Sequence, residues 1–265
     1  MKSSGCLNTK THLSRAIEKL MELIETDVLI VGAGAAGMYA SISAAKSNAR
    51  VMLCDKSLIS RGGATVMAQM TVAAALGHQE ADHWTHHLQD TIKSGQELCN
   101  EKLSYLLCKN APEKIRQMRD WKTNWANDNE RIRQLLAPGH GVKRCCYVDF
   151  LNTGPAVSRT LRGEVAKLKN VKRVSGLTII DLVVEKNRVI GAIGLNTEAG
   201  EYVSIGAKAI VLAAGGLTQL FARNSASKNM GGDSHALALR AGANLMDMEF
   251  VQFFPIGHLA PRLVG

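Results

Sequence analysis

The sequence has no C-x-x-C pair, although it contains six cysteines. Zinc ribbons and iron–sulfur clusters are commonly built on such pairs, so neither is expected here. Two of the cysteines, Cys145 and Cys146, are adjacent. We expect them to be packed thiols in a reducing compartment rather than a disulfide, and a vicinal redox pair is the less favoured alternative. The others are Cys6, Cys54, Cys99 and Cys108.

Long apolar runs are also missing. The longest apolar stretches fall short of the roughly 18 residues that a membrane-spanning helix requires, so no direct membrane span is expected. Near the N-terminus, Arg15, Glu18 and Lys19 interrupt the one candidate for a secretory signal. A signal peptide needs an unbroken apolar core. The default expectation is therefore a cytoplasmic location.

The chain lacks any block of basic charge. Its net charge is +9, but Lys and Arg are scattered and never run to five in a row. A solvated surface explains this distribution better than a nucleic-acid site, so no nucleic-acid partner is expected. Anionic cofactors and substrates agree with the basic charge. With 265 residues, 46% hydrophobic and 21% charged, the chain can form one large or two small globular domains.

A metal-binding H-E-x-x-H motif is absent as well. His83 and His87 are spaced i, i+4 on a predicted helix, which can suit a metal. No set of thiolates or carboxylates nearby completes such a site. We therefore expect His83, His86 and His87 to be surface or packing residues, and we expect no metal.

What the sequence does contain is a strand, a glycine-rich turn, a helix and a second strand within residues 26–56, TDVLIVGAGAAGMYASISAAKSNARVMLCDK. Its first apolar, β-branched run, residues 27–31, is typical of a buried parallel strand. Three glycines then follow with G-x-G-x-x-G spacing, and an Ala-rich helix is predicted over residues 35–47. Residues 50–54 predict the second strand, which ends at Asp55.

This arrangement favours dinucleotide binding. Gly32 permits the tight turn, Gly34 lets the backbone approach a pyrophosphate, and Gly37 lets the helix pack on the sheet. The helix N-terminus presents N–H groups and partial positive charge to the phosphates. Asp55 stands where an acid hydrogen-bonds a ribose hydroxyl, and it disfavours the 2′-phosphate of NADP. A glycine-rich turn in another α/β protein is the alternative, but it leaves Asp55 unexplained.

Helices are predicted in several other regions. Residues 11–25 carry apolar side chains at helical spacing and predict an amphipathic helix before the first strand. Residues 82–126 also have a helical pattern, in which one helix is expected to end before Pro112 and another to begin there. Residues 127–148 predict irregular structure, and residues 153–168 predict a further helix.

The later part of the chain alternates short strands with turns. Residues 171–208 predict a three-stranded antiparallel meander. A further buried strand, residues 208–212, ends in small residues that would allow a second backbone approach to a dinucleotide. A loop and a helix follow in residues 231–243, where Asp233 is expected to be the N-cap, a cofactor contact, or both.

The segment after Asp55 is rich in small residues. Gly62 and Gly63 allow backbone geometries that are closed to other residues. The alanines that follow, in residues 64–75, leave room for a bulky group such as a flavin ring. A tight loop that enters a small-residue helix explains them equally well.

Two backbone approaches separated by a meander resemble the flavoproteins with two dinucleotide-binding domains. Six segments point further: GGATVMAQ, DHWTHHLQDTIKSGQEL, KRCCYVDFLNTGPAVSRTLRGEV, AIVLAAGGLTQLF, GGDSHALALRAGA and DMEFVQFFP. Their order resembles the fumarate reductase and succinate dehydrogenase flavoprotein subunit family, which also includes L-aspartate oxidase and the adenylylsulfate reductase α-subunit. The resemblance covers about residues 26–257. It implies an α/β fold: a Rossmann-like FAD-binding domain with a parallel sheet and an inserted antiparallel three-stranded meander.

The resemblance implies FAD as cofactor, hydride transfer between the flavin and a small organic acid, and transfer of electrons to an iron–sulfur partner protein. The pyrophosphate would be held by Gly32, Gly34, Ala36 and Gly37, and the adenosine ribose by Asp55 with Lys56 beside it. The flavin would be lined by Gly63, Ala64, Thr65, Ala68 and Gln69. The adenosine side would be contacted by Ala214, Gly215 and Gly216, and Asp233 would lie near the isoalloxazine end.

Two departures from the family pattern matter. Ala64 stands where succinate dehydrogenases and membrane-bound fumarate reductases carry the histidine that links covalently to FAD, so FAD is expected to be noncovalent. In the segment that is H-P-T-G in the family, Phe254 and Ile256 replace the carboxylate-binding histidine and the threonine. A dicarboxylate would lose two partners there. An L-aspartate oxidase-like or adenylylsulfate reductase-like enzyme therefore stays open.

Family members continue for a comparable length beyond residue 265. The expected organisation is an N-terminal amphipathic helix (1–25), an FAD-binding domain (26–250) and the start of a truncated capping domain (251–265). The proton-shuttling arginine would lie beyond Gly265, so no catalytic residue is expected within the chain and little catalysis from it alone. A truncated, noncatalytic dinucleotide-binding module is the alternative from another class.

Overall fold

The computed structural model describes residues 22–69, 71–149 and 151–253, with the backbone alone at Glu22. These form two compact units. One holds the described residues of Met1–Ala64 and Val165–Gly265, and the other is Thr65–Glu164. The expectations for residues 11–21 and for Phe254 and Ile256 fall outside the described residues.

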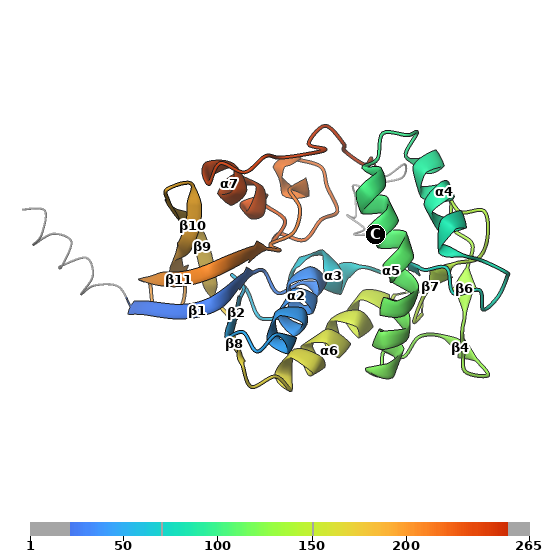
Figure 1. Ribbon diagram of the computed structural model, residues 1–265, viewed down its shortest axis with the longest axis horizontal. Helices are drawn as coiled ribbons and strands as arrows, with labels where there is room; N and C mark the ends of the chain where they lie inside the picture. Colours follow the sequence, from blue (N-terminus) through green and yellow to red (C-terminus); the bar gives the residue numbers. More distant parts are fainter. Residues whose placement is uncertain (1–21, 70, 150, 254–265) are drawn as a thin grey trace, which may run out of the picture. The chain divides into compact units, whose positions relative to one another are not determined.

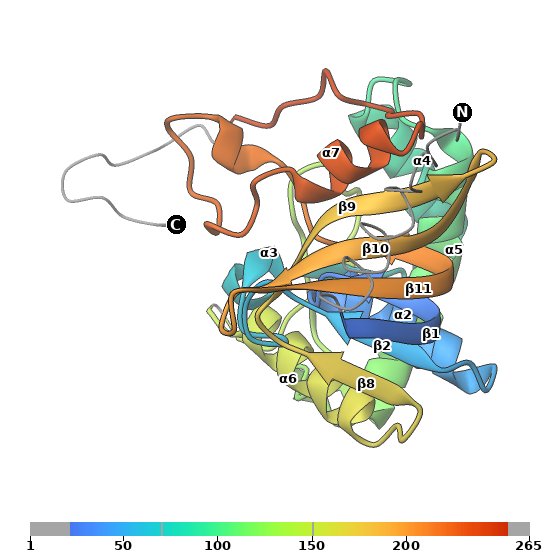
Figure 2. The same ribbon diagram turned by 90° about the vertical axis from the view of Figure 1, so that its left-hand side faces the viewer.

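A six-stranded sheet forms the frame of the first unit. Its strands are β1 (Glu22–Val31), β2 (Val51–Cys54), β8 (Val171–Val174), β9 (Leu177–Glu185), β10 (Arg188–Asn196) and β11 (Glu201–Leu212). Their order across the sheet is β8-β2-β1-β11-β10-β9 (Figures 1 and 2). The pairs from β8 to β11 are parallel, and β11, β10 and β9 pair antiparallel. The predicted parallel sheet and three-stranded meander are confirmed.

Strand β11 belongs to both halves of this sheet. It pairs with β10 from Gly191↔Gly206 to Asn196↔Glu201, and with β1 from Glu22↔Val203 to Val31↔Leu212. The last strand of the predicted meander and the further strand predicted at residues 208–212 are therefore one strand, β11. The prediction of two separate strands is wrong, because β11 pairs with β1 without interruption. The same pairing corrects the predicted helix at residues 22–25, which form the start of β1. Tertiary pairing there overrides the helical spacing of the side chains.

Apolar side chains from most of these strands form one buried cluster. Its members are Leu29, Val31, Met52, Cys54, Leu177, Ile179, Ala192, Val203, Ile205, Ala207 and Leu237. Leu237 comes from α7 (Asp233–Arg240), so this helix is held against the sheet. Helix α2 (Ala35–Lys46) buries a stripe spaced three to four residues apart, Gly37, Met38, Ser41, Ile42 and Ala45. The first unit also contains the 3₁₀ turn η1 (Thr218–Leu220), and the short helix α3 (Gly63–Met67) runs from the first unit into the second.

Helices and short strands make up the second unit. Helices α4 (Trp84–Ser94) and α5 (Glu101–Asp120) pack together. Helix α6 (Thr153–Ala166) is the last element of the unit along the sequence. The strands are β3 (Val72–Ala73), β4 (Asn127–Asp128), β5 (Arg131–Ile132), β6 (Gln134–Leu135) and β7 (Cys145–Cys146). They form one sheet in the order β3-β7-β6 and a separate β4-β5 pair. The region predicted as irregular, residues 127–148, thus contains four short strands.

Helix α5 corrects the prediction at Pro112. The proline lies inside a continuous helix of 20 residues rather than at the start of a new one. An interior proline removes one backbone hydrogen bond and usually bends or ends a helix. Here Pro112 is buried on the same face as Cys108 and Ile115, so packing of that face outweighs the lost bond. The helical pattern also ends earlier than predicted, at Asp120, and Trp125 follows as a buried loop residue.

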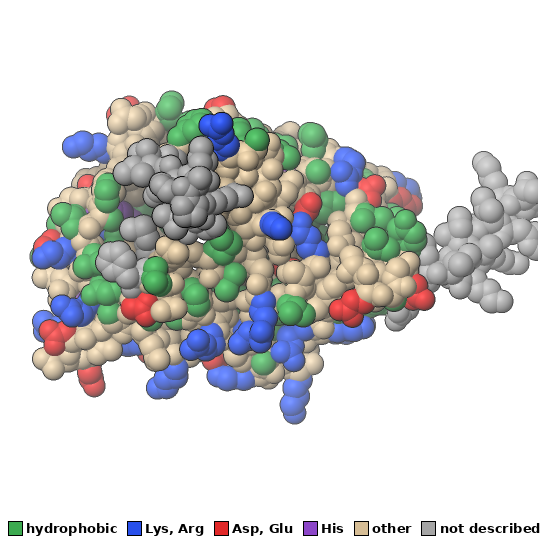
Figure 3. Space-filling view, turned by 180° about the vertical axis from the view of Figure 1, so that it is seen from behind, with side chains coloured by type: hydrophobic (Ala, Val, Ile, Leu, Met, Phe, Trp, Pro, Cys, Tyr) green, Lys and Arg blue, Asp and Glu red, His purple; other side chains and the backbone are tan. Residues whose placement is uncertain are grey.

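Lys and Arg side chains are spread over the face shown in Figure 3, with Asp and Glu side chains among them. Within the described residues, none of the helices is long and apolar enough to cross a membrane.

Candidate functional site: the glycine turn at the ends of three parallel strands

The site lies where three parallel strands end. Val31 of β1 is paired with Cys54 of β2 on one side and with Leu212 of β11 on the other. The chain leaves all three strands at this edge of the sheet. Carboxyl ends of parallel strands are the usual binding edge of an open α/β sheet. Most of the residues that the sequence assigns to dinucleotide binding lie in the segments that follow these three strands.

Gly32 fixes the turn out of β1. Its backbone N–H donates to the Cys54 carbonyl at 2.8 Å, and its φ of +103° lies where side chains are strained. A Cβ at Gly32 would come within 2.4 Å of the Ala213 carbonyl oxygen. Any larger residue would therefore push apart the ends of β1 and β11. The role predicted for Gly32 in the turn agrees with this geometry.

Gly37 has a different reason to lack a side chain. A Cβ there would lie 1.8 Å from the Gly32 carbonyl oxygen, so helix α2 could not pack against the turn. Gly34 is the N-cap of α2, in extended conformation and without a side-chain capping bond. The first turn of α2 contains no acidic residue. The positive end of the helix is thus not countered by a carboxylate of its own first turn, which suits an anionic ligand.

Asp55 is bound directly to the glycine turn. Its Oδ2 accepts a hydrogen bond from the Ala33 N–H at 2.7 Å. Its Oδ1 accepts from the Ser57 N–H at 2.8 Å and from the Ser57 hydroxyl at 2.7 Å. The acid that the sequence places at the tip of β2 therefore faces the turn between β1 and α2. A ribose beside this turn would meet a carboxylate that is already held in place.

Lys56 and Asp233 meet although 177 positions separate them in the sequence. Lys56 Nζ lies 2.5 Å from Asp233 Oδ2, and both side chains are partly exposed. Asp233 is the first residue of α7, and the N-cap is Gly232 with φ +86°. The expectation that Asp233 is the N-cap is therefore wrong, because the chain enters α7 in a left-handed conformation that favours glycine.

The end of β11 supplies the third exit. The Ala213 N–H donates to the Val31 carbonyl at 2.7 Å, which extends the ladder by one residue. The Ala214 N–H donates to the Ser234 hydroxyl at 2.9 Å. Gly215 has a φ of +83°, and the Gly216 carbonyl accepts from the Gly232 N–H at 3.1 Å. This exit is thereby bound to the start of α7.

The predicted flavin-lining residues divide between the two units. Gly63 and Ala64 belong to the first unit, whereas Thr65, Ala68 and Gln69 belong to the second. Within the second unit, the Ala68 carbonyl accepts from the Gly154 N–H at 2.7 Å. A Cβ on Gly154 would come within 2.1 Å of the Thr65 carbonyl oxygen. The small-residue segment is thus packed closely against the start of α6.

Sequence reasoning missed three side chains of the site. Ser57 holds Asp55, Asn229 Nδ2 donates to the Ser57 hydroxyl at 3.0 Å, and Ser234 accepts from Ala214. Ser57 had a local signal, because an aspartate side chain often accepts a hydrogen bond from the backbone N–H two residues on. Asn229 had none, since 172 positions separate it from its partner.

The cysteine at the end of β2 is poorly placed to act as a nucleophile. Cys54 is fully buried, and burial together with the neighbouring Asp55 raises the pKa of its thiol to about 12. Cys145 and Cys146 are also buried free thiols, as expected. Burial, with a smaller contribution from Cys145, raises the pKa of Cys146 to about 12. A protonated buried thiol is unreactive, which argues against a vicinal redox pair.

Two histidines of the second unit lie beside a buried arginine. Arg144 is 1% exposed and binds Asp82 through Nε at 3.0 Å and Asp90 through Nη1 at 2.8 Å. The rings of His87 and His140 lie 5.6 Å apart beside it. Burial, and then Arg144, lowers the pKa of His87 to about 4. Among the described residues no group that could hold a metal ion is found.

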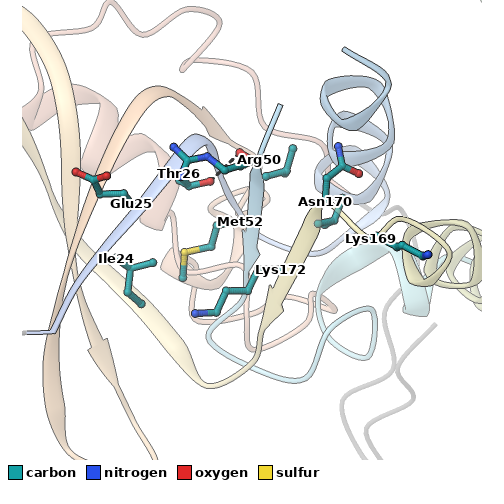
Figure 4. A pocket seen from close by; sticks show the side chains of 10 residues that line it. Ile24, Glu25, Thr26, Arg50, Met52, Lys169, Asn170 and Lys172 are labelled. Carbon is teal, nitrogen blue, oxygen red and sulfur yellow. Dashed lines mark hydrogen bonds between the residues drawn. The ribbon is translucent and has the colours of Figure 1, made fainter. Parts of the chain in front are cut away.

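A pocket of about 280 Å³ lies elsewhere in the first unit (Figure 4). It is lined by side chains at the amino ends of β2 and β8 and by the first half of β1, including Met52, Thr26 and Lys172. Asp55 follows the opposite, carboxyl end of β2. This pocket is therefore separate from the glycine turn.

Residues 27–264 match the family described as FAD binding domain. An uncharacterized FAD-dependent oxidoreductase of Methanocaldococcus jannaschii, MJ0033, is 34% identical over 235 residues, which cover 88% of this chain and 43% of that protein. One of the subunits of the CoM/CoB fumarate reductase of Methanothermobacter marburgensis is 31% identical over 243 residues, 91% of this chain and 44% of that protein.

A solved structure has a similar fold over most of this chain. The Mycobacterium smegmatis Sdh1 complex in the apo form contains a chain that superposes with a TM-score of 0.86 and 33% sequence identity, covering 89% of this chain and 42% of that one. The chain thus spans less than half the length of these relatives.

Proposed function

Because the chain belongs to the family of FAD binding domains, we propose that it is the FAD-binding part of an oxidoreductase of the fumarate reductase and succinate dehydrogenase type. The observation that carries the proposal is the hydrogen bond from the Ala33 N–H to Asp55. It joins the acid that we propose reads the ribose to the turn that we propose binds the pyrophosphate. The same edge of the sheet receives the small residues at the end of β11.

The chain's own groups suit the polar parts of FAD. The first turn of α2, from Gly34 to Gly37, offers backbone N–H groups and the positive end of a helix to the pyrophosphate. Asp55 accepts a ribose hydroxyl. The Lys56–Asp233 pair joins the segment after β2 to the start of α7. FAD, when bound, supplies the hydride and electron transfer.

The proposed attachment of FAD is noncovalent. Ala64 has no nucleophilic side chain. It stands at the position of the histidine that links covalently to FAD in succinate dehydrogenases and membrane-bound fumarate reductases. The buried Cys54 thiol stays protonated and cannot substitute for it. FAD is then held by backbone donors and by shape, and it should be released on unfolding.

The proposed substrate class is a small organic acid, and the proposed electron acceptor is an iron–sulfur partner. The relative from Methanothermobacter marburgensis is named as one of the subunits of a fumarate reductase, which supports a multisubunit setting. Phe254 and Ile256 replace two polar partners of a dicarboxylate, so an L-aspartate oxidase-like or adenylylsulfate reductase-like reaction is the alternative. A cytoplasmic location is part of the proposal.

FAD binding is tested by titrating the chain with FAD and following the flavin fluorescence. We expect one FAD per chain. Gly34→Asp should weaken binding by about tenfold or more, corresponding to about 1.4 kcal/mol, because its carboxylate would occupy the phosphate position. Aspartate is a favourable N-cap residue, so α2 should remain folded. The control is Ser43→Asp on the exposed side of α2. No FAD binding by the unchanged chain, or equal effects of both substitutions, contradicts the proposal.

The reaction is tested by following the reduction of the bound flavin. FAD-loaded protein is mixed under anaerobic conditions with succinate, L-aspartate or sulfite, and the flavin absorbance is followed. Bleaching by succinate supports the proposed class, and bleaching only by L-aspartate or sulfite supports the corresponding alternative. Bound FAD that none of the three reduces favours a noncatalytic dinucleotide-binding module.

A further inference from the structure

A chain of hydrogen bonds leads from the loop before α7 to the acid at the end of β2. Asn229 Nδ2 donates to the Ser57 hydroxyl oxygen at 3.0 Å, and the Ser57 hydroxyl donates to Asp55 Oδ1 at 2.7 Å. A serine hydroxyl has one proton, and Asp55 can only accept when it is ionised. The direction of the chain is therefore fixed, from the Asn229 amide through Ser57 to the carboxylate.

These contacts leave the two oxygens of Asp55 unequal. Oδ1 accepts from both the N–H and the hydroxyl of Ser57, which fills its two lone pairs. Oδ2 accepts from the Ala33 N–H, which leaves one lone pair. The remaining acceptor position is therefore on the oxygen that faces the glycine turn, where the ribose of a bound dinucleotide would lie.

The surroundings are shaped to keep this chain in place. A Cβ on Gly62 would come within 2.2 Å of Asn229 Nδ2 and 2.6 Å of Ser57 Oγ, so the glycine makes room for both groups. Asn229 lies on the loop between η1 and α7. That loop is closed on itself, because the Gln219 N–H donates to the Met230 carbonyl and the Gln219 side chain donates to the Ala226 carbonyl. Asn229 thus belongs to a loop that is stabilised by hydrogen bonds of its own.

We propose that Ser57 and Asn229 are positioning residues that hold Asp55 so that Oδ2 reads a hydroxyl of the adenosine ribose. The inference rests on the proposed function, because it assigns the ribose of FAD to Asp55. It adds two residues that lie 172 positions apart in the sequence to the specificity of that site. Neither residue touches the ribose, and both act through the orientation of one carboxylate.

The test compares the affinities of the chain for ADP and for 2′,3′-dideoxy-ADP, which lacks both ribose hydroxyls. A hydrogen bond from a hydroxyl to a charged carboxylate should make ADP bind about tenfold or more tightly than the dideoxy analogue. Asp55→Ala should bring the ratio of the two affinities close to one. Ser57→Ala and Asn229→Ala should each reduce the ratio by about threefold or more, because Oδ2 is no longer held toward the ribose. Ser43→Ala, on the exposed side of α2, is the matched control.

A double mutant separates positioning from general damage. Asn229 acts through Ser57, so Asn229→Ala should have little further effect on the ratio when Ser57 is already alanine. Thermal unfolding of each variant reports whether the fold is kept. A loss of stability that weakens both nucleotides equally, or additive effects of the two substitutions on the ratio, contradicts the inference.

The outcomes also distinguish this inference from the proposed function. Failure of the unchanged chain to bind ADP or FAD contradicts the proposed function. Tight ADP binding with a ratio that depends on Asp55, but not on Ser57 or Asn229, leaves the proposed function intact and overturns the positioning role.

Discussion

At the scale of single residues, the most buried charge in the described part of the second unit is Arg144. Both Arg144 and Asp82 have side chains that are 1% exposed, and Asp90 binds the same guanidinium. The Arg144 carbonyl also accepts from the Ala74 N–H at 2.9 Å, next to β3. One residue therefore joins the segment just before α4 to the end of β3.

Replacing Arg144 with methionine should destabilise the protein strongly. The substitution leaves Asp82 buried without its partner, which typically costs about 3–5 kcal/mol. Denaturant unfolding measures the loss. The matched control is Arg50→Met, which breaks the exposed Arg50–Asp27 pair and should leave the unfolding midpoint nearly unchanged. Similar midpoints for the two variants would show that the buried cluster does not stabilise the fold.

His87 should make stability depend on pH. It is 4% exposed, and burial followed by the charge of Arg144 lowers its pKa from 6.5 to about 4. Between these pH values the unfolded chain binds the proton more tightly than the folded chain. The contribution of neutral His87 is therefore complete above pH 6.5 and is lost as the pH falls toward 4, by at most about 1.4 kcal/mol per pH unit.

The measurement is urea unfolding at several pH values between about 4 and 7, the window in which the two pKa values of His87 lie. His87→Gln should reduce the slope of the unfolding free energy against pH. His86→Gln, at a position with a side chain that is 63% exposed, should keep the slope of the unchanged protein. An unchanged slope in His87→Gln would mean that other groups, such as His140 or His78, cause the dependence, since burial lowers the pKa of each of these as well.

At the scale of elements, helix α6 contains two glycines with opposite requirements. Gly163 faces open space, and no atom lies within 4 Å of a Cβ built there. Gly154 lies against the small-residue segment, and a Cβ would come within 2.1 Å of the Thr65 carbonyl oxygen and 2.4 Å of the Ala68 carbonyl oxygen. The same substitution should thus have opposite effects in one helix.

Gly163→Ala should raise the free energy of unfolding by about 0.5–1 kcal/mol, because alanine restricts the unfolded chain and favours the helix. Gly154→Ala should lower it, since backbone oxygens cannot move aside as a flexible side chain can. Both values come from thermal or urea unfolding monitored by circular dichroism. A stabilising Gly154→Ala would refute the close packing of α6 on residues 65–68.

Sequence patterns predicted the elements whose signals are local. The strand, turn and helix around Gly32, the acid at Asp55 and the three-stranded meander all follow from periodicity and glycine spacing. Pro112 misled the prediction because burial of one face of α5 outweighs a missing hydrogen bond, and that balance depends on a neighbouring helix. Residues 22–25 misled it because pairing with β11, about 180 positions later in the sequence, decides their conformation.

The finer structure of the site could not be predicted for a similar reason. The acid and the turn are joined by Ala33, whose side chain carries no signal. Asn229 and Asp233 reach the segment after β2 across 172 and 177 positions of the sequence. Such contacts depend on the path of the chain through the sheet, which no local pattern encodes.

At the scale of the whole molecule, the proposed function depends on where a dinucleotide binds. The first unit brings three parallel strand ends together, and each contributes small residues or an acid at that edge. The pocket at the amino ends of β2 and β8 is instead lined by Lys169, Lys172 and apolar side chains such as Met52. Lysines at one end of the sheet and backbone N–H groups at the other both attract phosphate, so the location of the bound nucleotide is the decisive quantity.

An amide-resolved NMR titration of the ¹⁵N-labelled chain with ADP measures that location directly. Binding at the glycine turn should cause saturable shifts at the backbone amides of Ala33, Gly34 and Gly37 and at Asp55, with the amides around Lys172 unchanged. Shifts centred on Lys172 and Met52, or no shift at the glycine turn at saturating ADP, would contradict it.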